Sequence, residues 1–183
     1  KAILAIHSYL YWVETEFSRK IDFFHLRGQD NILRHLPVGS VVVRLHADDS
    51  LFEILARICA VRATGNHLRV SIPKGVDTPA IRFLDAPEGR RLTVQTPVFQ
   101  EADAGLIASI PKVDRIRYAA PERASLEVLQ AGNAANGCVV SVPVSAEGRL
   151  ELLWYVREQS ISTDYHRYGN LGIRADEPRA EVL

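Results

Sequence analysis

The fold is decided by residues 41–65, VVVRLHADDSLFEILARICAVRATG, where a β-branched run is followed at once by an amphipathic pattern. Residues 41–45 are rich in valine, which favours strands. Apolar residues then recur three or four positions apart over residues 51–64, the period of one helix face. Asp49 or Ser50 can cap that helix, and a glycine follows its end. The stretch therefore predicts one strand followed by one helix.

The same alternation continues toward the C-terminus. Further strands are predicted at residues 68–72, 91–96, 114–119 and 138–144, with helical segments at 78–84, 101–110 and 121–137 between them. Strands that alternate with helices at intervals of about two dozen residues are typical of a parallel sheet covered on both faces. We therefore predict an α/β, Rossmann-like, doubly wound, mostly parallel five-stranded sheet. The pattern leaves the order of the strands open.

The segments on either side of this core are predicted to differ from it. Residues 1–20 carry an apolar stripe at helical spacing, and residues 21–37 form a connector rich in charged and aromatic side chains. We divide the chain into an N-terminal helix and connector (1–37), a Rossmann-like core (38–147), and a docking arm with the C-terminal tail (148–183).

Residues 148–157 (GRLELLWYVR) fit two structures. Apolar residues alternate as in a strand, and they also fall three or four apart as in a helix. Periodicity does not separate the two. We favour an extended arm that leaves the sheet and leads into the tail.

Residues 158–172 (EQSISTDYHRYGNLG) crowd polar and aromatic side chains into one short run. Rigid aromatic rings beside arginines suit a surface that contacts other protein. We expect Arg157 and Arg167 to pair with carboxylates or carbonyls, and Gly169 with Asn170 to form a closing turn. The alternative is a terminal hairpin that packs on its own domain. The predicted interaction residues are Trp154, Tyr155, Arg157, Glu158, Ser160, Ser162, Tyr165, His166, Arg167, Tyr168 and Asn170.

Composition limits the classes of function. Lys plus Arg and Asp plus Glu both number 22, so the net charge is zero and gives no footprint for nucleic acid or anionic membrane. No stretch is apolar enough for a membrane span or a signal peptide, which predicts a soluble, cytoplasmic protein. Cys59 and Cys138 form no CxxC pair, so we expect neither a disulfide framework nor a metal site. The absence of Met and the start at Lys1 predict a piece of a longer protein or a processed N-terminus.

Binding of a nucleotide cofactor is disfavoured by the turn after the first core strand. A dinucleotide needs a glycine-rich turn there, but residues 46–50 read HADDS, and the carboxylates of Asp48 and Asp49 would repel a diphosphate. We expect no cofactor in this chain. The chain also has no G-x-S-x-G nucleophile motif, so we expect no catalytic residue. The alternative is a nucleotide or small-metabolite site at the carboxyl ends of the strands, with His46, Ser71 and Lys74 as candidates.

Five passages of the sequence together resemble a known family. They are YLYWVETEFSR (9–19), GQDNILRHLP (28–37), VRLHADDSLFEILARI (43–58), RIRYAAPER (115–123) and GRLELLWYVREQSISTDYHRYGNLG (148–172). In this order they are similar to the C-terminal region of the bifunctional proline dehydrogenase/L-glutamate-γ-semialdehyde (Δ1-pyrroline-5-carboxylate) dehydrogenases, also called proline utilisation A. Residues 74–112 are not distinctive.

The resemblance implies a parent enzyme that uses FAD to oxidise proline and NAD to oxidise the semialdehyde to glutamate. It implies that this chain is an aldehyde-dehydrogenase-superfamily-like domain without activity. Such a domain would dock on the aldehyde dehydrogenase module of its own parent chain and help enclose the intermediate. The chain lacks the family's Gly-Gln-x-Cys loop and Glu-Leu-Gly-Gly-Lys motif, as this role requires. A third hypothesis is self-association, in which the arm pairs with its copy by edge-strand addition.

Overall fold

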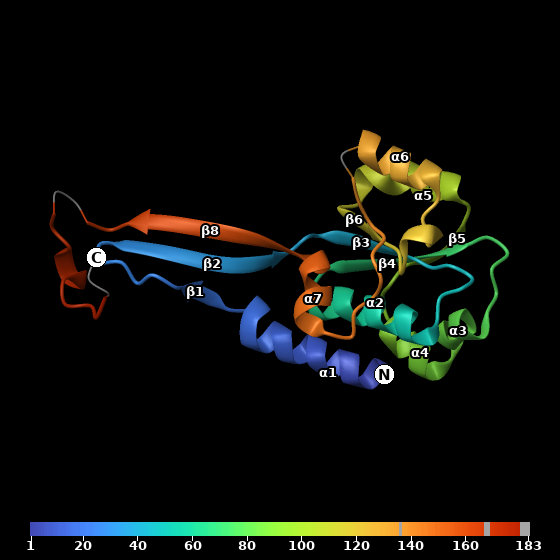
Figure 1. Cartoon of the computed structure of the whole chain (residues 1–183), viewed down its shortest axis with the longest axis horizontal. Helices are drawn as coiled ribbons and strands as arrows, with labels where there is room; N and C mark the ends of the chain where they lie inside the picture. The colour runs from blue at the N-terminus through green and yellow to red at the C-terminus, as the bar shows by residue number, and fades with distance from the viewer. Residues whose placement is uncertain (136, 167–168, 180–183) are drawn as a thin grey trace.

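A five-stranded parallel sheet forms the centre of the molecule in the computed structural model, which describes residues 1–135, 137–166 and 169–179 (Figure 1). Its strands are β3 (Ser40–Arg44), β4 (His67–Pro73), β5 (Val98–Glu101), β6 (Arg115–Arg117) and β7 (Cys138–Val140). Their order is β5-β4-β3-β6-β7, and every neighbouring pair is parallel. Within this sheet the middle strand, β3, comes first in the sequence, and the later strands are added on either side of it, which confirms the predicted doubly wound fold.

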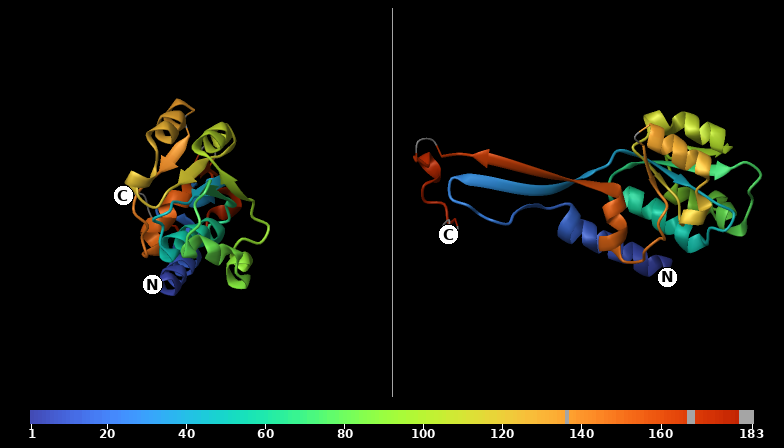
Figure 2. Two further views of the ribbon diagram at one scale, coloured as in Figure 1. Left: turned by 90° about the vertical axis from the view of Figure 1, so that its right-hand side faces the viewer. Right: turned by 45° about the horizontal axis from the view of Figure 1, so that its top comes forward.

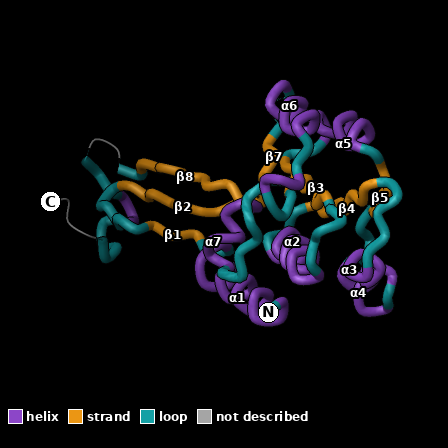
Figure 3. Tube along the Cα trace, turned by 45° about the vertical axis from the view of Figure 1, so that its right-hand side comes forward, coloured by secondary structure: helices purple, strands orange, loops and turns teal. Residues whose placement is uncertain are grey.

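Alternate residues of β3 supply two hydrophobic cores. Val41 and Val43 are buried in one cluster with α2, whereas Val42 is buried in a second cluster with α5 and α6. The helices are α1 (Ala2–Trp12), α2 (Leu51–Ala63), α3 (Pro79–Arg82), α4 (Pro87–Leu92), α5 (Asp103–Ser109) and α6 (Leu126–Ala134). Helices α5 and α6 cover one face of the sheet, and α1 to α4 lie on the other (Figure 3).

The third strand of the core was placed wrongly from the sequence. Residues 91–96 alternate like a strand, but Arg91 and Leu92 end helix α4 and the strand begins at Val98. Pro87 occupies the first turn of α4, where its fixed backbone angle favours a helix. Gly89 lets this helix pack closely, because a Cβ there would lie 2.0 Å from the carbonyl oxygen of Phe83. These contacts of Pro87 and Gly89 favour the helix, although apolar and polar residues alternate over residues 91–96.

Residues 21–37 are not a connector. They contribute β1 (Lys20–Asp22) and β2 (Gln29–Pro37) to a second, antiparallel sheet with β8 (Val156–Asp164), in the order β1-β2-β8. The carboxylate of Asp22 holds the turn, since Oδ1 accepts the backbone N–H groups of Phe24 (3.1 Å) and His25 (2.9 Å). This sheet projects away from the central domain as an arm (Figures 1 and 2).

The extended arm predicted from residue 148 begins eight residues later. Helix α7 (Gly148–Leu152) and a 3-10 turn (Leu153–Tyr155) precede β8. Glu151, Leu152 and Tyr155 are all fully buried. Buried residues one and four positions apart lie on one face of a helix, so the helical alternative for residues 148–157 is the correct one up to Tyr155. Gly148 packs against α1, where a Cβ would lie 2.6 Å from the carbonyl oxygen of Ser8.

Candidate functional site

The arm sheet has little internal packing among the described residues. β2 and β8 pair along nine residues each, from Gln29↔Asp164 to Pro37↔Val156. No residue of β8 is buried, and the Ile161 side chain is 36% exposed. Antiparallel sheets normally cover a core on at least one face. The described part of the chain supplies no such cover for β8.

One edge of β8 is open, and its register can be deduced. Tyr165 N–H donates to Gly28 O (2.9 Å) and Val38 N–H donates to Tyr155 O (3.2 Å), which marks both as hydrogen-bonded pairs. Such pairs alternate along an antiparallel ladder. The backbone groups of residues 157, 159, 161 and 163 therefore face β2, and those of 158, 160, 162 and 164 face the open edge. Within the described residues, β8 pairs only with β2.

The tip of the arm is an ion-pair cluster made with the tail. Arg174 pairs with Asp30 (2.9 Å) and Glu177 (2.6 Å), and Arg179 also pairs with Asp30 (2.6 Å). The Arg174 guanidinium lies 3.7 Å from the centre of the Tyr165 ring. Its hydrogen bond, followed by that of Arg179, lowers the pKa of Asp30 from 3.8 to about 2. These contacts hold the tail against the arm.

We expect acid to release the tail. Because the pKa of Asp30 is lower in the folded chain, its contribution to stability is present above pH 3.8 and is lost as the pH falls toward about 2. The carboxyl carbon of Asp30 should therefore titrate well below pH 3.8 in an NMR pH series. In Arg174→Met, which loses the first of the two arginine partners, this midpoint should move back toward 3.8. A wild-type midpoint at 3.8 would contradict the assignment.

The predicted interaction residues have different environments. Arg157, Glu158, Ser160 and Ser162 are exposed on β8. Trp154 is 37% exposed, whereas Tyr155 is fully buried and donates its hydroxyl hydrogen to Glu151 Oε1 (2.9 Å). Tyr155 therefore does not supply the exposed contact area predicted for it, because its ring completes the domain core.

The remaining predicted interaction residues lie near the arm tip or beyond the described chain. His166 Nδ1 lies 3.0 Å from Gly28 O, and Asn170 Oδ1 accepts the Gly172 N–H (2.8 Å) in a turn, close to where the sequence predicted one. Arg167 and Tyr168 lie outside the described residues.

The carboxyl edge of the central sheet is occupied by a buried arginine. The Arg57 guanidinium donates to Arg44 O (2.8 Å) and Arg117 O (3.3 Å), the last residues of β3 and β6, and it pairs with Asp49 (2.5 Å). Both side chains of this pair are fully buried. Arg123 is a second partner of Asp49 (2.7 Å). Asp49 therefore does not stand free to repel phosphate, as the sequence suggested, because two arginines neutralise its charge.

This arrangement was not predicted, although the sequence held a signal for it. Arg57 lies three residues after Ile54 on the apolar face of the helix, so burial of its charge required a partner. Asp49 supplies the partner from the turn before the helix. Ser50 and Glu53 then form a capping box, with Glu53 Oε2 accepting the Ser50 N–H at 2.8 Å.

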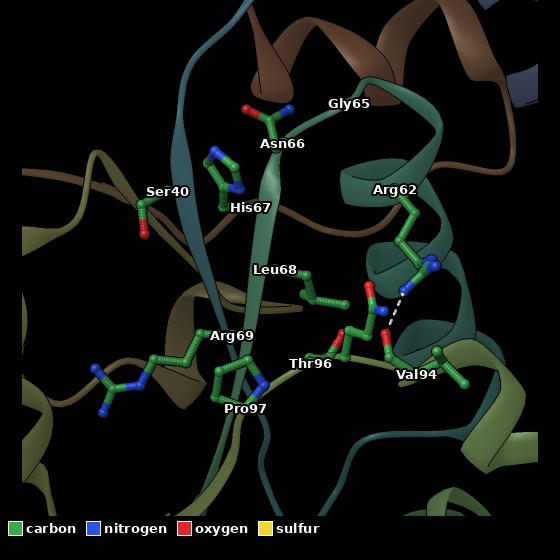
Figure 4. A pocket seen from close by; sticks show the side chains of 11 residues that line it. Ser40, Arg62, Gly65, Asn66, His67, Leu68, Arg69, Val94, Thr96 and Pro97 are labelled. Atoms are coloured by element: carbon green, nitrogen blue, oxygen red, sulfur yellow. Dashed lines mark hydrogen bonds between the residues drawn. The ribbon is translucent and has the colours of Figure 1, made fainter.

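A pocket of about 550 Å³ lies at the opposite, amino edge of the sheet (Figure 4). Ser40 and His67 lie on one side of β4, while Leu68 and Arg62 lie on the other. Arg62 Nη1 donates to Val94 O (3.2 Å). The polar groups therefore do not converge on a single position, and the pocket offers no plausible reaction centre.

A smaller pocket of about 290 Å³ lies at the carboxyl edge and has His46 in its lining. Of the other two candidates for a metabolite site, Ser71 is buried with its hydroxyl between Arg44 (2.9 Å) and Glu101 (2.6 Å). Lys74 is exposed and is not part of the lining. Burial, and then the nearby Asp103 carboxylate, raise the pKa of Tyr118 in this pocket, so its hydroxyl keeps its proton at neutral pH.

Known structures share this architecture. No model of a known protein family matches the chain, and no curated protein matches it. Proline utilisation A from Corynebacterium freiburgense is similar over 91% of the chain, with 23% identity and a TM-score of 0.61. A variant of proline utilisation A from Bradyrhizobium japonicum is similar over 77%, with 14% identity and a TM-score of 0.61. Betaine aldehyde dehydrogenase from Staphylococcus aureus is similar over 75%, with 15% identity and a TM-score of 0.57.

The chain has an aldehyde-dehydrogenase-like fold. It spans 14% and 15% of the two proline utilisation A chains and 29% of the betaine aldehyde dehydrogenase chain. An aldehyde-dehydrogenase-like domain of this size is thus a small part of the solved proteins that contain it. In the described part of this chain, no helix has the length and apolar character needed to cross a bilayer.

Proposed function

We infer that this aldehyde-dehydrogenase-like domain is a non-catalytic structural domain of a proline-catabolic bifunctional enzyme. In this proposal it lies in the C-terminal region of the enzyme, its arm docks on the dehydrogenase module, and it helps enclose the intermediate between proline and glutamate. One observation carries the proposal. Among the described residues, strand β8 has an open edge and no buried residue, so it has backbone and side-chain groups free for a partner.

The carboxyl edge of the sheet supports the non-catalytic part of the proposal. Arg57 occupies the position between β3 and β6 where α/β proteins bind ligands at the point of strand reversal. A dinucleotide would have to displace a buried, paired charge. FAD and NAD would then bind to the other domains of the parent enzyme, and neither would bind to this domain.

Removal of residues 165–183 from the parent enzyme tests the docking role. We expect the coupled conversion of proline to glutamate to slow and to show a lag, because the intermediate escapes. Proline oxidation alone, and dehydrogenase activity with added semialdehyde, serve as controls and should persist. Coupled turnover and assembly identical to those of the intact enzyme would refute the role.

Calorimetric titration of the 183-residue chain tests the absence of a cofactor. We expect no heat of binding with NAD⁺ or NADH at millimolar concentration. Binding tighter than about 100 µM, or about 5.5 kcal/mol, would instead favour the nucleotide-binding alternative.

A second copy of the chain is the other candidate partner for β8, because an open strand edge can also pair with itself. Sedimentation of the isolated chain distinguishes the two partners. A dimer that persists when the dehydrogenase module is present in excess would favour self-association.

A further inference from the structure

The pocket at the carboxyl edge is enclosed by three elements. Arg44 and His46 come from the end of β3 and the turn after it, Tyr118 follows β6, and Ser125 caps the N-terminus of α6. The N-terminal end of a helix carries partial positive charge. The pocket, about 290 Å³, has room for a small acid and is at the lower limit for drug-sized ligands.

The buried acceptors of this pocket already have donors. Asp103 Oδ1 accepts from Arg44 (2.6 Å), and its Oδ2 accepts from Ser125 Oγ (2.7 Å). Glu122 is the other acidic residue of the lining, and it is exposed to solvent. A bound cation would therefore have to compete with contacts that already exist.

The groups that remain are donors. The Tyr118 hydroxyl is buried beside Arg44, and in the described part of the chain it makes no hydrogen bond of good geometry. Arg123 uses only Nη1 in its contacts with Asp49 and Glu53, which leaves Nε and Nη2. His46 also lines the pocket, and its Nδ1 lies 3.2 Å from the Asp48 backbone nitrogen and 3.4 Å from Asp48 Oδ2.

A buried hydroxyl without a hydrogen bond of good geometry is costly in a folded protein and calls for an explanation. Here it lines the same pocket as an arginine with spare donors, the His46 ring and a helix N-terminus. We propose that this pocket binds a small oxyanion, either a carboxylate or a phosphate group. The site does not depend on the docking role, and it differs from a dinucleotide site because Arg57 closes the space between β3 and β6.

Titration of the 183-residue chain with inorganic phosphate and, separately, with malonate tests the proposal at constant ionic strength set with chloride. Binding of either probe supports the site, and the preferred probe identifies the source of the oxyanion. We expect Tyr118→Phe and Arg123→Met each to weaken binding about tenfold, the effect of losing one hydrogen bond to a charged group. His67→Ala, at the opposite edge of the sheet, should bind as the wild type does.

Tyr118→Phe also separates a binding role from a structural one. Without a ligand, the variant should be at least as stable as the wild type, because the removed hydroxyl makes no hydrogen bond of good geometry. The rise in melting temperature that the better probe produces should then shrink only in this variant and in Arg123→Met. Failure of both probes to bind at about 10 mM, or equal affinity in wild type and Tyr118→Phe, would overturn the proposal.

Discussion

Arg117→Met is expected to lower the free energy of unfolding by about 3–5 kcal/mol, the usual cost of leaving one member of a buried ion pair alone. The Arg117 and Glu151 side chains are both fully buried, with Nη2 and Oε1 2.9 Å apart. Arg117 Nη1 also donates to Val142 O (2.6 Å). Its loss leaves both a charge and a carbonyl oxygen without a partner.

The effect should extend to the base of the arm. Glu151 accepts hydrogen bonds from the Tyr155 hydroxyl (2.9 Å) and from Ser145 N–H (2.8 Å), so it joins α7 to the turn before β8. An unpaired Glu151 carboxylate would draw water into this region. Urea denaturation followed by circular dichroism measures the change.

The control is the double variant Arg117→Met with Glu151→Gln. The glutamine carries no charge, and its side-chain oxygen can still accept a hydrogen bond from Tyr155 or Ser145, so the double variant should recover part of the loss. A loss below about 1 kcal/mol in the single variant, or a double variant less stable than the single, would contradict the assignment.

Ser160→Pro is expected to weaken the proposed docking of the chain on a dehydrogenase module at least tenfold, or about 1.4 kcal/mol. Residue 160 is exposed, and its backbone groups face the open edge of β8. Proline removes an N–H that a partner strand would use and places a ring in its path. Because edge strands tolerate proline where the N–H faces outward, the arm itself should remain folded.

Two further variants serve as controls. Affinity is measured by calorimetry and folding by circular dichroism. Ser160→Ala keeps the backbone donor and should dock like the wild type. In Ile161→Pro the lost N–H faces β2, so both the arm and docking should fail. Unchanged affinity of Ser160→Pro would show that the partner does not bind along this edge.

The sequence predicted the central sheet because the patterns of that sheet are local. The β-branched run at 41–45 and the amphipathic helix after it depend on neighbours within a few residues, and the structure confirms both. The strand at 98–101 was missed because an exposed edge strand of four residues has little apolar pattern. The close contact of Gly89 with Phe83, which accompanies the helix before this strand, also could not be deduced from the sequence.

The arm and the carboxyl-edge pocket depend on contacts between distant parts of the chain. Nothing near residues 29–37 reveals that their partner is β8. The pocket likewise is lined by Arg44, Tyr118 and Arg123, which lie far apart in the sequence and come together only in the folded chain. The sequence identified Asp49 as a candidate helix cap. Its ion pairs with Arg57 and Arg123 depend on the folded structure and could not be predicted from the sequence pattern.

The pairing of β2 with β8 also fixes an order of events during synthesis. The Gln29 and Asp164 side chains, which hydrogen-bond across the two strands, are 135 positions apart, and all five strands of the central sheet lie between them. A contact of such long range forms slowly, and on the ribosome β2 must wait until β8 has emerged. The open edge of β8 therefore exists only after the five strands of the central sheet have been made. A chain that stops before β8 never forms this edge.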